Sequence, residues 1–266
     1  MSENLKELYQ IQKVLKDTNH HDISRISKEI QEYCGKKAIS PTLVLERIES
    51  GEPWEYVQGE SEFYGNKFLL NSKTLIPRPE TEKMVDIAIS FLEENPNYKN
   101  VIDVGTGSGC IIISLAKVLK DKDGINLTGV DIDKEALSIA EENSLLHKVN
   151  EKVSFLKGNL LKQVTLKDGT LIIANLPYIP RDIYKKLDRS VVNFEPKRAL
   201  LGGNDGLKYY KKLISQLKKA HKKDISLLIE IEPSTLGNLQ SVLGNYEVNV
   251  IKDYRNLDRF VLVNLS

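Results

Sequence analysis

The sequence is poor in the features that mark several large classes of protein. Its 266 residues include only two cysteines, Cys34 and Cys110, which lie far apart and lack the spacing of a metal site. We therefore expect two buried thiols in a reducing compartment. No apolar run approaches the ~20 residues of a membrane helix, and the first residues lack the basic and then apolar pattern of a signal peptide. These absences predict a cytoplasmic protein that does not associate with a membrane.

A strong excess of charge of one sign is also missing. The 38 basic and 37 acidic residues give a net charge of +1, which predicts no direct binding to nucleic acid through global attraction. Partners must therefore be recognised locally, and we expect a monomer. Hydrophobic residues make up 41% and charged residues 28%, as in ordinary globular proteins. The length suits one large domain and a small one.

Residues 1–51 show helical periodicity and predict a small bundle of three helices. The apolar residues of the first helix recur at helical spacing from Leu5 to Leu15. Asp22 caps a second helix that Gly35 is expected to end, and Ser40-Pro41 opens a third. The segment contains no catalytic constellation. We interpret it as a recognition or scaffolding domain.

Residues 52–79 differ in composition and predict a linker. Aromatic residues and glycines cluster there, and short alternating runs around Gly65-Asn66 predict a β-hairpin. Pro77 and Pro79 impose an extended path before a helix that begins near Glu80.

From residue 80 to 266, helices and strands alternate, which predicts an α/β domain. This order is typical of a mainly parallel sheet with helices on both faces. Only residues 254–257 separate the last two strands, so these should pair antiparallel. The expected strands are 101–105, 126–131, 153–158, 170–175, 225–231, 247–253 and 258–265, and the expected helices are 80–94, 109–120, 133–147, 206–221 and 234–243.

The first chemical motif is a glycine loop between a strand and a helix, in VIDVGTGSGCIIISLA. Glycines there let the backbone turn tightly and approach a ligand, and the helix start offers free N–H groups. Cys110 stands where a dinucleotide fingerprint needs its third glycine, so the spacing suits a nucleoside without a pyrophosphate. The candidate cofactor-binding residues are Gly105, Thr106, Gly107, Ser108 and Gly109.

Two further strand ends supply polar groups to the same sheet edge. Asp131 ends the next strand, where a carboxylate can accept both hydroxyl protons of a ribose, and Asp133 is expected to cap the following helix. Asn159 and Leu160 follow the third strand. They suit an adenine amino group and its ring, although Asn159 also fits a simple turn.

The third motif is Asn175-Leu176-Pro177-Tyr178, directly after the apolar strand that ends at Ala174. Pro177 has no N–H with which to continue a sheet. The side-chain oxygen of Asn175 and the carbonyl of Leu176 can together accept both hydrogens of a planar –NH₂ group. The motif therefore predicts a site that orients an amide or amino nitrogen.

Further motifs occur in order along the chain. Gly51-Glu52-Pro53 spans the start of the linker, which also contains Phe63-Tyr64-Gly65. Residues 76–82 read IPRPETE, and residues 194–206 contain FEP and GGNDG. With the glycine loop, Asp131 and NLPY, these residues resemble the Rossmann-like class I methyltransferases that use S-adenosylmethionine to methylate amide or amino nitrogens. Within that group the chain is similar to the release-factor glutamine N5-methyltransferases (the PrmC/HemK family), over roughly residues 40–265.

The resemblance implies an activity and roles for the site. It implies methyl transfer from S-adenosyl-L-methionine, with S-adenosyl-L-homocysteine as product, to the glutamine in the Gly-Gly-Gln motif of peptide chain release factors. It implies that residues 1–51 recognise the substrate and that Asn175 contacts both cofactor and acceptor. The implied catalytic residues are Asn175, Pro177 and Tyr178, and the implied substrate-binding residues are these three with Leu176, Arg78 and Glu195.

One departure leaves alternatives open. The family's usual tetrapeptide is NPPY, whereas this chain has Leu176. NLPY also resembles the rRNA adenine N6-dimethylases, and the sibling enzymes methylate a glutamine of a ribosomal protein. The IPRPETE segment favours the release-factor branch. The expected helix near Lys208–Lys223 is strongly basic, which fits a solvated face or a docking surface for an acidic partner.

Overall fold

The computed structural model describes residues 3–18, 22–122, 124–220 and 222–265. The chain divides into two compact units, residues 1–60 with 188–194 and residues 61–187 with 195–266. The boundary between the units falls inside the predicted linker. The short segment 188–194 groups with the first unit, which the sequence did not indicate. None of the helices in the described ranges is long and apolar enough to cross a membrane.

The first unit is a small helical bundle around one hydrophobic core. It contains α1 (Glu3–Asp17), α2 (Ile23–Lys37), α3 (Pro41–Glu49), the short α4 (Trp54–Gln58) and α9 (Arg189–Phe194). The core is formed by Ile11, Val14, Leu15, Ile26, Ile30, Cys34, Val44, Leu45, Ile48, Trp54 and Val57. Burial of Trp54 is compatible with its polar Nε1, because this atom donates to Glu29 at 2.8 Å. The three predicted helices are confirmed, while α4 was not predicted.

The predicted end of α2 is wrong. Asp22 accepts from the backbone N–H of Arg25, as expected of a cap, but the helix continues through Gly35 to Lys37. It ends at Ala38, which adopts a left-handed conformation (φ 54°) and donates its N–H to Cys34. A glycine inside a helix costs only about 1 kcal/mol relative to alanine. Burial of neighbouring Cys34 in the core outweighs that cost.

The second unit opens with the predicted hairpin, β1 (Glu60–Phe63) and β2 (Asn66–Leu69), which form a two-stranded sheet. Tyr64 and Gly65 make the turn, both with positive φ. Phe63 and Phe68 are fully buried beneath it. The hairpin thereby contributes to the core of the second unit.

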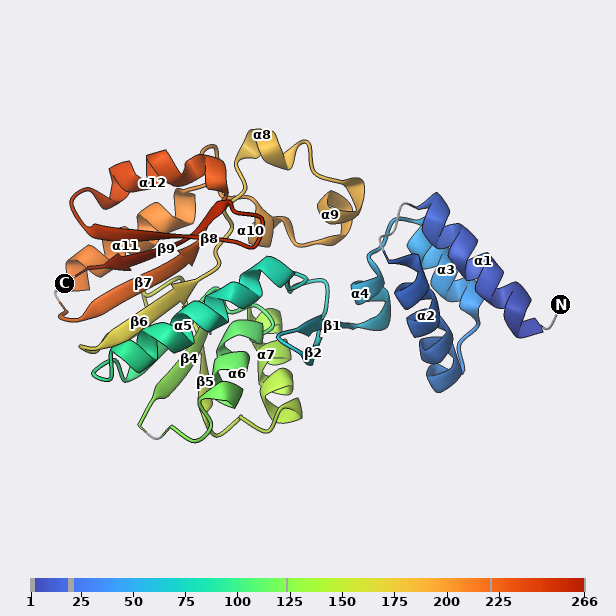
Figure 1. The fold of residues 1–266 in the computed structure, drawn as a ribbon, viewed down its shortest axis with the longest axis horizontal. Coiled ribbons are helices and arrows are strands. Elements are labelled where there is room, and N and C mark those ends of the chain that lie inside the picture. Colours follow the sequence, from blue (N-terminus) through green and yellow to red (C-terminus); the bar gives the residue numbers. More distant parts are fainter. Residues whose placement is uncertain (1–2, 19–21, 123, 221, 266) are drawn as a thin grey trace. The chain divides into compact units, whose positions relative to one another are not determined.

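A larger sheet forms the centre of the second unit, and among the described residues it has seven strands in the order β5-β4-β3-β6-β7-β9-β8 (Figure 1). The strands from β5 to β7 pair in parallel, and β9 runs antiparallel to both β7 and β8. This confirms the predicted sheet. Its strands are β3 (Asn100–Val104), β4 (Asn126–Asp131), β5 (Val153–Lys157), β6 (Thr170–Ala174), β7 (Ile225–Glu230), β8 (Glu247–Lys252) and β9 (Asp258–Asn264).

Helices cover both faces of this sheet (Figure 1). Successive residues of β6 alternate between two cores: Leu171 and Ile173 join the core with α5 and α6, and Ile172 and Ala174 join the core with α11 and α12. The helices are α5 (Glu82–Glu94), α6 (Cys110–Val118), α7 (Lys134–Leu146), α11 (Lys208–Ala220) and α12 (Leu236–Leu243), with the short α8 (Arg181–Tyr184) and α10 (Lys197–Leu200) after β6.

The predicted elements of residues 80–266 are present, and their ends differ by one or two residues. A 3₁₀ turn over Pro79–Thr81 precedes α5. Residue 221 of the predicted helix 206–221 lies outside the described residues. Cys34 and Cys110 are both buried and free, as predicted.

The register of the strands brings the chemical motifs together. Val104 of β3 pairs with Val130 of β4, so the glycine loop lies beside Asp131. On its other side β3 pairs with β6. The chain therefore places β4 and β5 on one side of β3, and it then crosses over to place β6 on the other side of β3. In open α/β sheets, ligands bind at such a switch point.

Candidate active site

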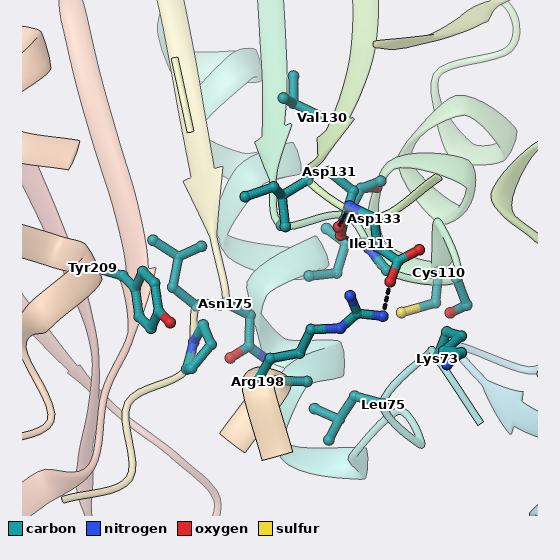
Figure 2. Close-up of a pocket in the computed structure, with 18 of the residues that line it drawn as sticks. Lys73, Leu75, Cys110, Ile111, Val130, Asp131, Asp133, Asn175, Arg198 and Tyr209 are labelled. Carbon is teal, nitrogen blue, oxygen red and sulfur yellow. Dashed lines mark hydrogen bonds and ion pairs between the residues drawn. The ribbon is translucent and has the colours of Figure 1, made fainter. Parts of the chain in front are cut away.

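A pocket of about 360 Å³ lies at the carboxyl ends of β3, β4 and β6 (Figure 2). It combines an apolar surface with several convergent polar groups, as small-molecule sites usually do. Most of the residues predicted from the sequence line it. These are Arg78, Gly105, Thr106, Gly107, Ser108, Asp131, Asn159, Leu160, Asn175, Leu176 and Pro177.

Three predicted residues, all within the described ranges, are outside the pocket lining. Gly109 lies between helices: a Cβ there would come within 2.8 Å of Ile113 and 3.2 Å of the Ala140 side chain. The Tyr178 hydroxyl donates to Glu230 at 2.9 Å. Glu195 is buried and pairs with Arg78 at 2.5 Å. In this structure these residues support the site rather than form its walls.

The glycine loop approaches the tetrapeptide closely. Gly105 has φ +80°, and a Cβ on it would lie 2.9 Å from Cδ2 of Leu176. A side chain at position 105 would therefore clash and would require a rare backbone conformation. The carbonyl of Ser108 accepts from Asn143 of α7 at 2.9 Å, which ties the end of the loop to the neighbouring helix.

Asp131 holds the loop from the end of β4. One carboxylate oxygen accepts from the N–H of Gly107 at 3.0 Å, and the other accepts from the N–H of Asp133 at 2.8 Å. Each oxygen keeps a further acceptor position, because a carboxylate offers about four. Burial raises the pKa of Asp131 above its ordinary value. The side chain is only partly buried, so it is available to a ligand in the pocket.

Asp133 caps α7, as predicted, by accepting from the backbone N–H of Glu135 at 2.6 Å. Its other oxygen pairs with Arg198, which extends across the pocket (Figure 2). Arg198 is half exposed and comes from α10, in the segment that follows the tetrapeptide. This ion pair joins the β4 side of the pocket to the β6 side.

Asp103 lies directly beneath the loop, near the end of β3. It is 1% exposed, and one of its oxygens accepts from Thr106 at 2.6 Å. Burial, reinforced by the nearby Asp131, raises the pKa of Asp103 to about 7. Its second oxygen has no hydrogen-bond partner among the described residues. Burial without a partner for this oxygen favours the protonated, neutral form of Asp103.

The Asn159 side chain lies at the pocket but is already engaged. Its oxygen accepts from Lys212 of α11 at 2.7 Å, and its backbone N–H donates to Gln163 at 2.9 Å. Leu160 is buried and adopts φ +57°, which is uncommon for a residue with a side chain. Among the described residues, the amide nitrogen of Asn159 has no partner, and the arrangement does not test the predicted adenine contact.

Asn175 is held by a buried polar cluster. Its amide nitrogen donates to the Thr81 hydroxyl and to a carboxylate oxygen of Glu230, both at 3.1 Å. Thr81 donates in turn to the same Glu230 oxygen at 2.7 Å. The side chain of Asn175 thus reaches the pocket from a fixed position at the end of β6.

Four polar residues of IPRPETE connect the segment to different parts of the second unit. Arg78 pairs with Glu195, Thr81 contacts Glu230, and the backbone N–H of Tyr64 donates to Glu82 at 2.8 Å. Glu80 accepts from the Tyr254 hydroxyl at 2.8 Å. The segment therefore joins the hairpin, the sheet edge and the chain after the tetrapeptide around one pocket.

Comparisons with known proteins agree with this geometry. Residues 81–190 match the model of the Methyltransferase small domain. A Release factor glutamine methyltransferase of Fusobacterium nucleatum subsp. nucleatum is 37% identical over 256 residues, which cover 94% of this chain and 69% of the relative. One of Nitratidesulfovibrio vulgaris is 34% identical over 225 residues, covering 82% of this chain and 74% of the relative.

The chain belongs to the release factor glutamine methyltransferase family. Solved structures support the fold. The hMettl16 catalytic domain matches with a TM-score of 0.58 at 18% identity, over 74% of each chain. A ribosomal protein L11 methylase from Lactobacillus delbrueckii subsp. bulgaricus matches with a TM-score of 0.50 at 20% identity, over 77% of this chain and 89% of that one.

Leu176, the departure from the family's usual tetrapeptide, has a structural role of its own. Its backbone N–H donates to the Tyr210 hydroxyl at 3.1 Å, a bond that proline cannot make. Its side chain is buried against Gly105. The same Tyr210 hydroxyl donates to the backbone carbonyl of Glu230 and lies 3.4 Å from the carbonyl of Leu176.

Several site residues of this family member were missed in the sequence. Glu230 is the last residue of an apolar strand and Asp103 is the penultimate residue of another, whereas the sequence pattern identified Asp131 and Asn175 as polar residues at or just after the end of a strand. Lys73, Arg198 and Tyr209 also line the pocket, but they come from irregular segments or helices and have no local pattern. Only the folded chain brings them to the site.

Proposed function

We propose that this protein transfers a methyl group from S-adenosyl-L-methionine to the side-chain amide nitrogen of the glutamine in the Gly-Gly-Gln motif of peptide chain release factors. The observation that carries this proposal is the juxtaposition of Asn175 with the glycine loop and Asp131 in one pocket. Membership of the release factor glutamine methyltransferase family supports the choice of acceptor.

The residues of the pocket fit the proposed cofactor. Asp131 has free acceptor capacity for ribose hydroxyls, and Gly105 and Gly107 leave space for close approach. When bound, S-adenosylmethionine supplies a methyl group on a sulfonium and leaves as S-adenosylhomocysteine. We assign the cofactor to Gly105–Ser108, Asp131, Asn159, Leu160 and Asn175.

The chain provides positioning rather than an activating base. An amide nitrogen is a poor nucleophile, because its lone pair is delocalised. In our proposal the Asn175 oxygen and the Leu176 carbonyl accept its two N–H groups, which aims the nitrogen and favours the positive charge that develops on it. After the bond between nitrogen and carbon has formed, the positively charged nitrogen loses one of its two protons to solvent. Exclusion of water from the apolar pocket supports the same step.

Other parts of the chain receive supporting roles. We propose that residues 1–51 recognise the release factor and that residues 52–79 link them to the methyltransferase domain, residues 80–266. Pro177 fixes the path of the tetrapeptide, and Tyr178 anchors it through Glu230. We assign Arg78 to the acceptor side of the pocket, with Glu195 holding its guanidinium in place. We further propose that the protein acts as a cytoplasmic monomer.

A side-by-side assay tests the proposal. The purified protein and labelled cofactor are offered a release factor, the same factor with the motif glutamine replaced by alanine, a ribosomal protein and adenine-containing oligonucleotides. We expect label only in the unmodified release factor, on the motif glutamine by peptide mass spectrometry. Label in the ribosomal protein or the oligonucleotides instead would assign the acceptor to one of those classes and overturn the proposal.

A further inference from the structure

Glu230, the last residue of β7, is a buried carboxylate outside the pocket lining. It is 1% exposed and receives hydrogen bonds from three side chains, one in the IPRPETE segment and two in the tetrapeptide. Thr81 and Asn175 share one carboxylate oxygen at 2.7 and 3.1 Å, and Tyr178 binds the other at 2.9 Å. The sheet register explains this meeting point, because Ala174 of β6 pairs with Ile229 of β7 and the next residues are Asn175 and Glu230.

The cluster determines which end of the Asn175 amide faces the pocket. An ionised carboxylate can only accept, so a nitrogen of Asn175 must face it. The Thr81 hydroxyl has directed its single proton to Glu230, so it too can only accept from Asn175. An amide oxygen turned toward this pair would meet two acceptors and no donor. The oxygen of Asn175 must therefore face away from Glu230.

We propose that Glu230 is a positioning residue whose carboxylate fixes the amide of Asn175 with its oxygen toward the acceptor –NH₂ group. This inference rests on the proposed function, in which that oxygen accepts from the substrate nitrogen. Without the carboxylate, the amide can rotate and present its own –NH₂ group. Two donors would then face each other, and the substrate nitrogen would lose its aim.

The backbone of Glu230 reinforces the arrangement. The Tyr210 hydroxyl donates to the Glu230 carbonyl and accepts from the N–H of Leu176 at 3.1 Å. The end of β7 therefore holds both proposed acceptors of the substrate –NH₂ group. It holds Asn175 through the side chain of Glu230 and Leu176 through Tyr210.

The surroundings of Glu230 raise the pKa of its carboxyl group. Burial and the nearby Glu80 raise its pKa, whereas the Thr81 and Tyr178 hydroxyls and Arg259 oppose the rise. Tyr210, the other titratable group packed against it, stays neutral because burial raises its pKa well above the ordinary value. Acid should therefore protonate Glu230 at a higher pH than an exposed glutamate. A protonated carboxyl can donate to Asn175 and so permits the wrong amide orientation.

The variant Glu230→Gln tests the proposal, because it keeps the shape and removes the charge. We expect kcat on the release factor to fall by about 100-fold, the scale of loss for a misaligned reacting group. The Kd of the cofactor by calorimetry should stay within about twofold, because Glu230 does not line the pocket. The wild-type kcat should rise with pH through the Glu230 ionisation, and the variant should lack this rise.

Ser226→Ala is the matched control. Ser226 lies on the same strand and is buried, and its hydroxyl shares a hydrogen bond with Tyr98 at 3.0 Å. The control removes a buried hydrogen bond at the opposite end of β7, so it should lower the Tm without lowering kcat. A Glu230→Gln protein that folds and retains wild-type kcat and pH profile would overturn the inference.

A second measurement does not depend on activity. In NMR spectra of protein labelled with ¹⁵N asparagine, the side-chain –NH₂ signals of Asn175 are assigned as those missing from the spectrum of Asn175→Ala. They should shift with pH in the wild type and not in Glu230→Gln. If they do so while the wild type fails to methylate a release factor, the proposed function fails and the positioning by Glu230 stands. Signals that ignore pH in the wild type would overturn the positioning.

Discussion

At the scale of single residues, Asn175 has the most direct role in the proposed reaction. Its replacement by alanine removes an acceptor at the reacting nitrogen, so we expect kcat to fall at least ~100-fold. Cofactor affinity should largely survive, because the glycine loop and Asp131 remain. Single-turnover methylation and calorimetry measure the two effects. The control is Asn126→Ala, an exposed asparagine at the start of β4. Near wild-type activity of Asn175→Ala would remove Asn175 from the catalytic role.

Asp103 makes a second residue-scale prediction, on stability and pH. Its pKa is about 7 in the folded protein, above the ~3.9 of an unfolded chain. Between these values the native state binds more protons, so the free energy of unfolding falls as pH rises, by at most about 1.4 kcal/mol per unit. The loss levels off as the pH rises past the pKa of the folded protein.

Thermal denaturation without cofactor measures this effect. Asp103→Asn should flatten the dependence of Tm on pH between about 5 and 8, since it removes the titrating group. The exposed Asp121, changed to Asn, should leave the dependence as in the wild type. Equal pH dependence in wild type and Asp103→Asn would show that Asp103 does not titrate in this range.

At the scale of elements, the packing of α6 against α7 depends on Gly109. It has φ +80°, and an added Cβ would lie 2.8 Å from Ile113 and 3.2 Å from the Ala140 side chain. We expect Gly109→Ala to lower the free energy of unfolding by about 1–3 kcal/mol, through backbone strain and overpacking. Denaturant titration provides the measurement. Gly237→Ala in α12 is the opposite case, because its Cβ meets nothing within 4 Å. That change should leave stability equal or raise it by up to about 1 kcal/mol.

The elements also show what could be predicted from the sequence. The alternation of apolar strands and helices was enough for the order of elements and for the edge where Asp131 and Asn175 meet. Local pattern did not reveal Glu230 as a partner of Asn175, because that contact depends on the register of β6 and β7. Local pattern also predicted the wrong end for α2 at Gly35, where burial of the helix in the core keeps it intact. Arg198 comes from the short helix α10, and only the packing of the folded chain places it at the pocket.

At the scale of the whole molecule, the near-zero net charge conceals a local basic surface. Lys208 and Lys211 of α11 line a cavity with Arg181, Lys197 and Arg198, and Arg198 and Tyr209 also line the candidate active site. Among the described residues, Asp205 is the one acidic residue that lines this cavity. A basic surface beside the pocket suits an acidic region of an intact release factor. A short peptide that carries only the acceptor glutamine would not extend to it.

Reversal of charge at Lys208 and Lys211 tests this surface. Acidic residues are favourable in the first turn of a helix, and the ion pair of Lys211 with Asp205 that the change removes is exposed, so Lys208→Glu with Lys211→Glu should still fold. We expect kcat/KM on an intact release factor to fall by about tenfold, and this loss should be smaller at high salt. The kcat/KM on a Gly-Gly-Gln peptide should stay unchanged. The control is Lys99→Glu with Lys167→Glu, which changes the net charge equally. These two exposed lysines precede β3 and β6, at the amino-terminal ends of the strands and away from the pocket. Equal losses on peptide and protein, or equal losses in both double variants, would exclude a docking role for α11.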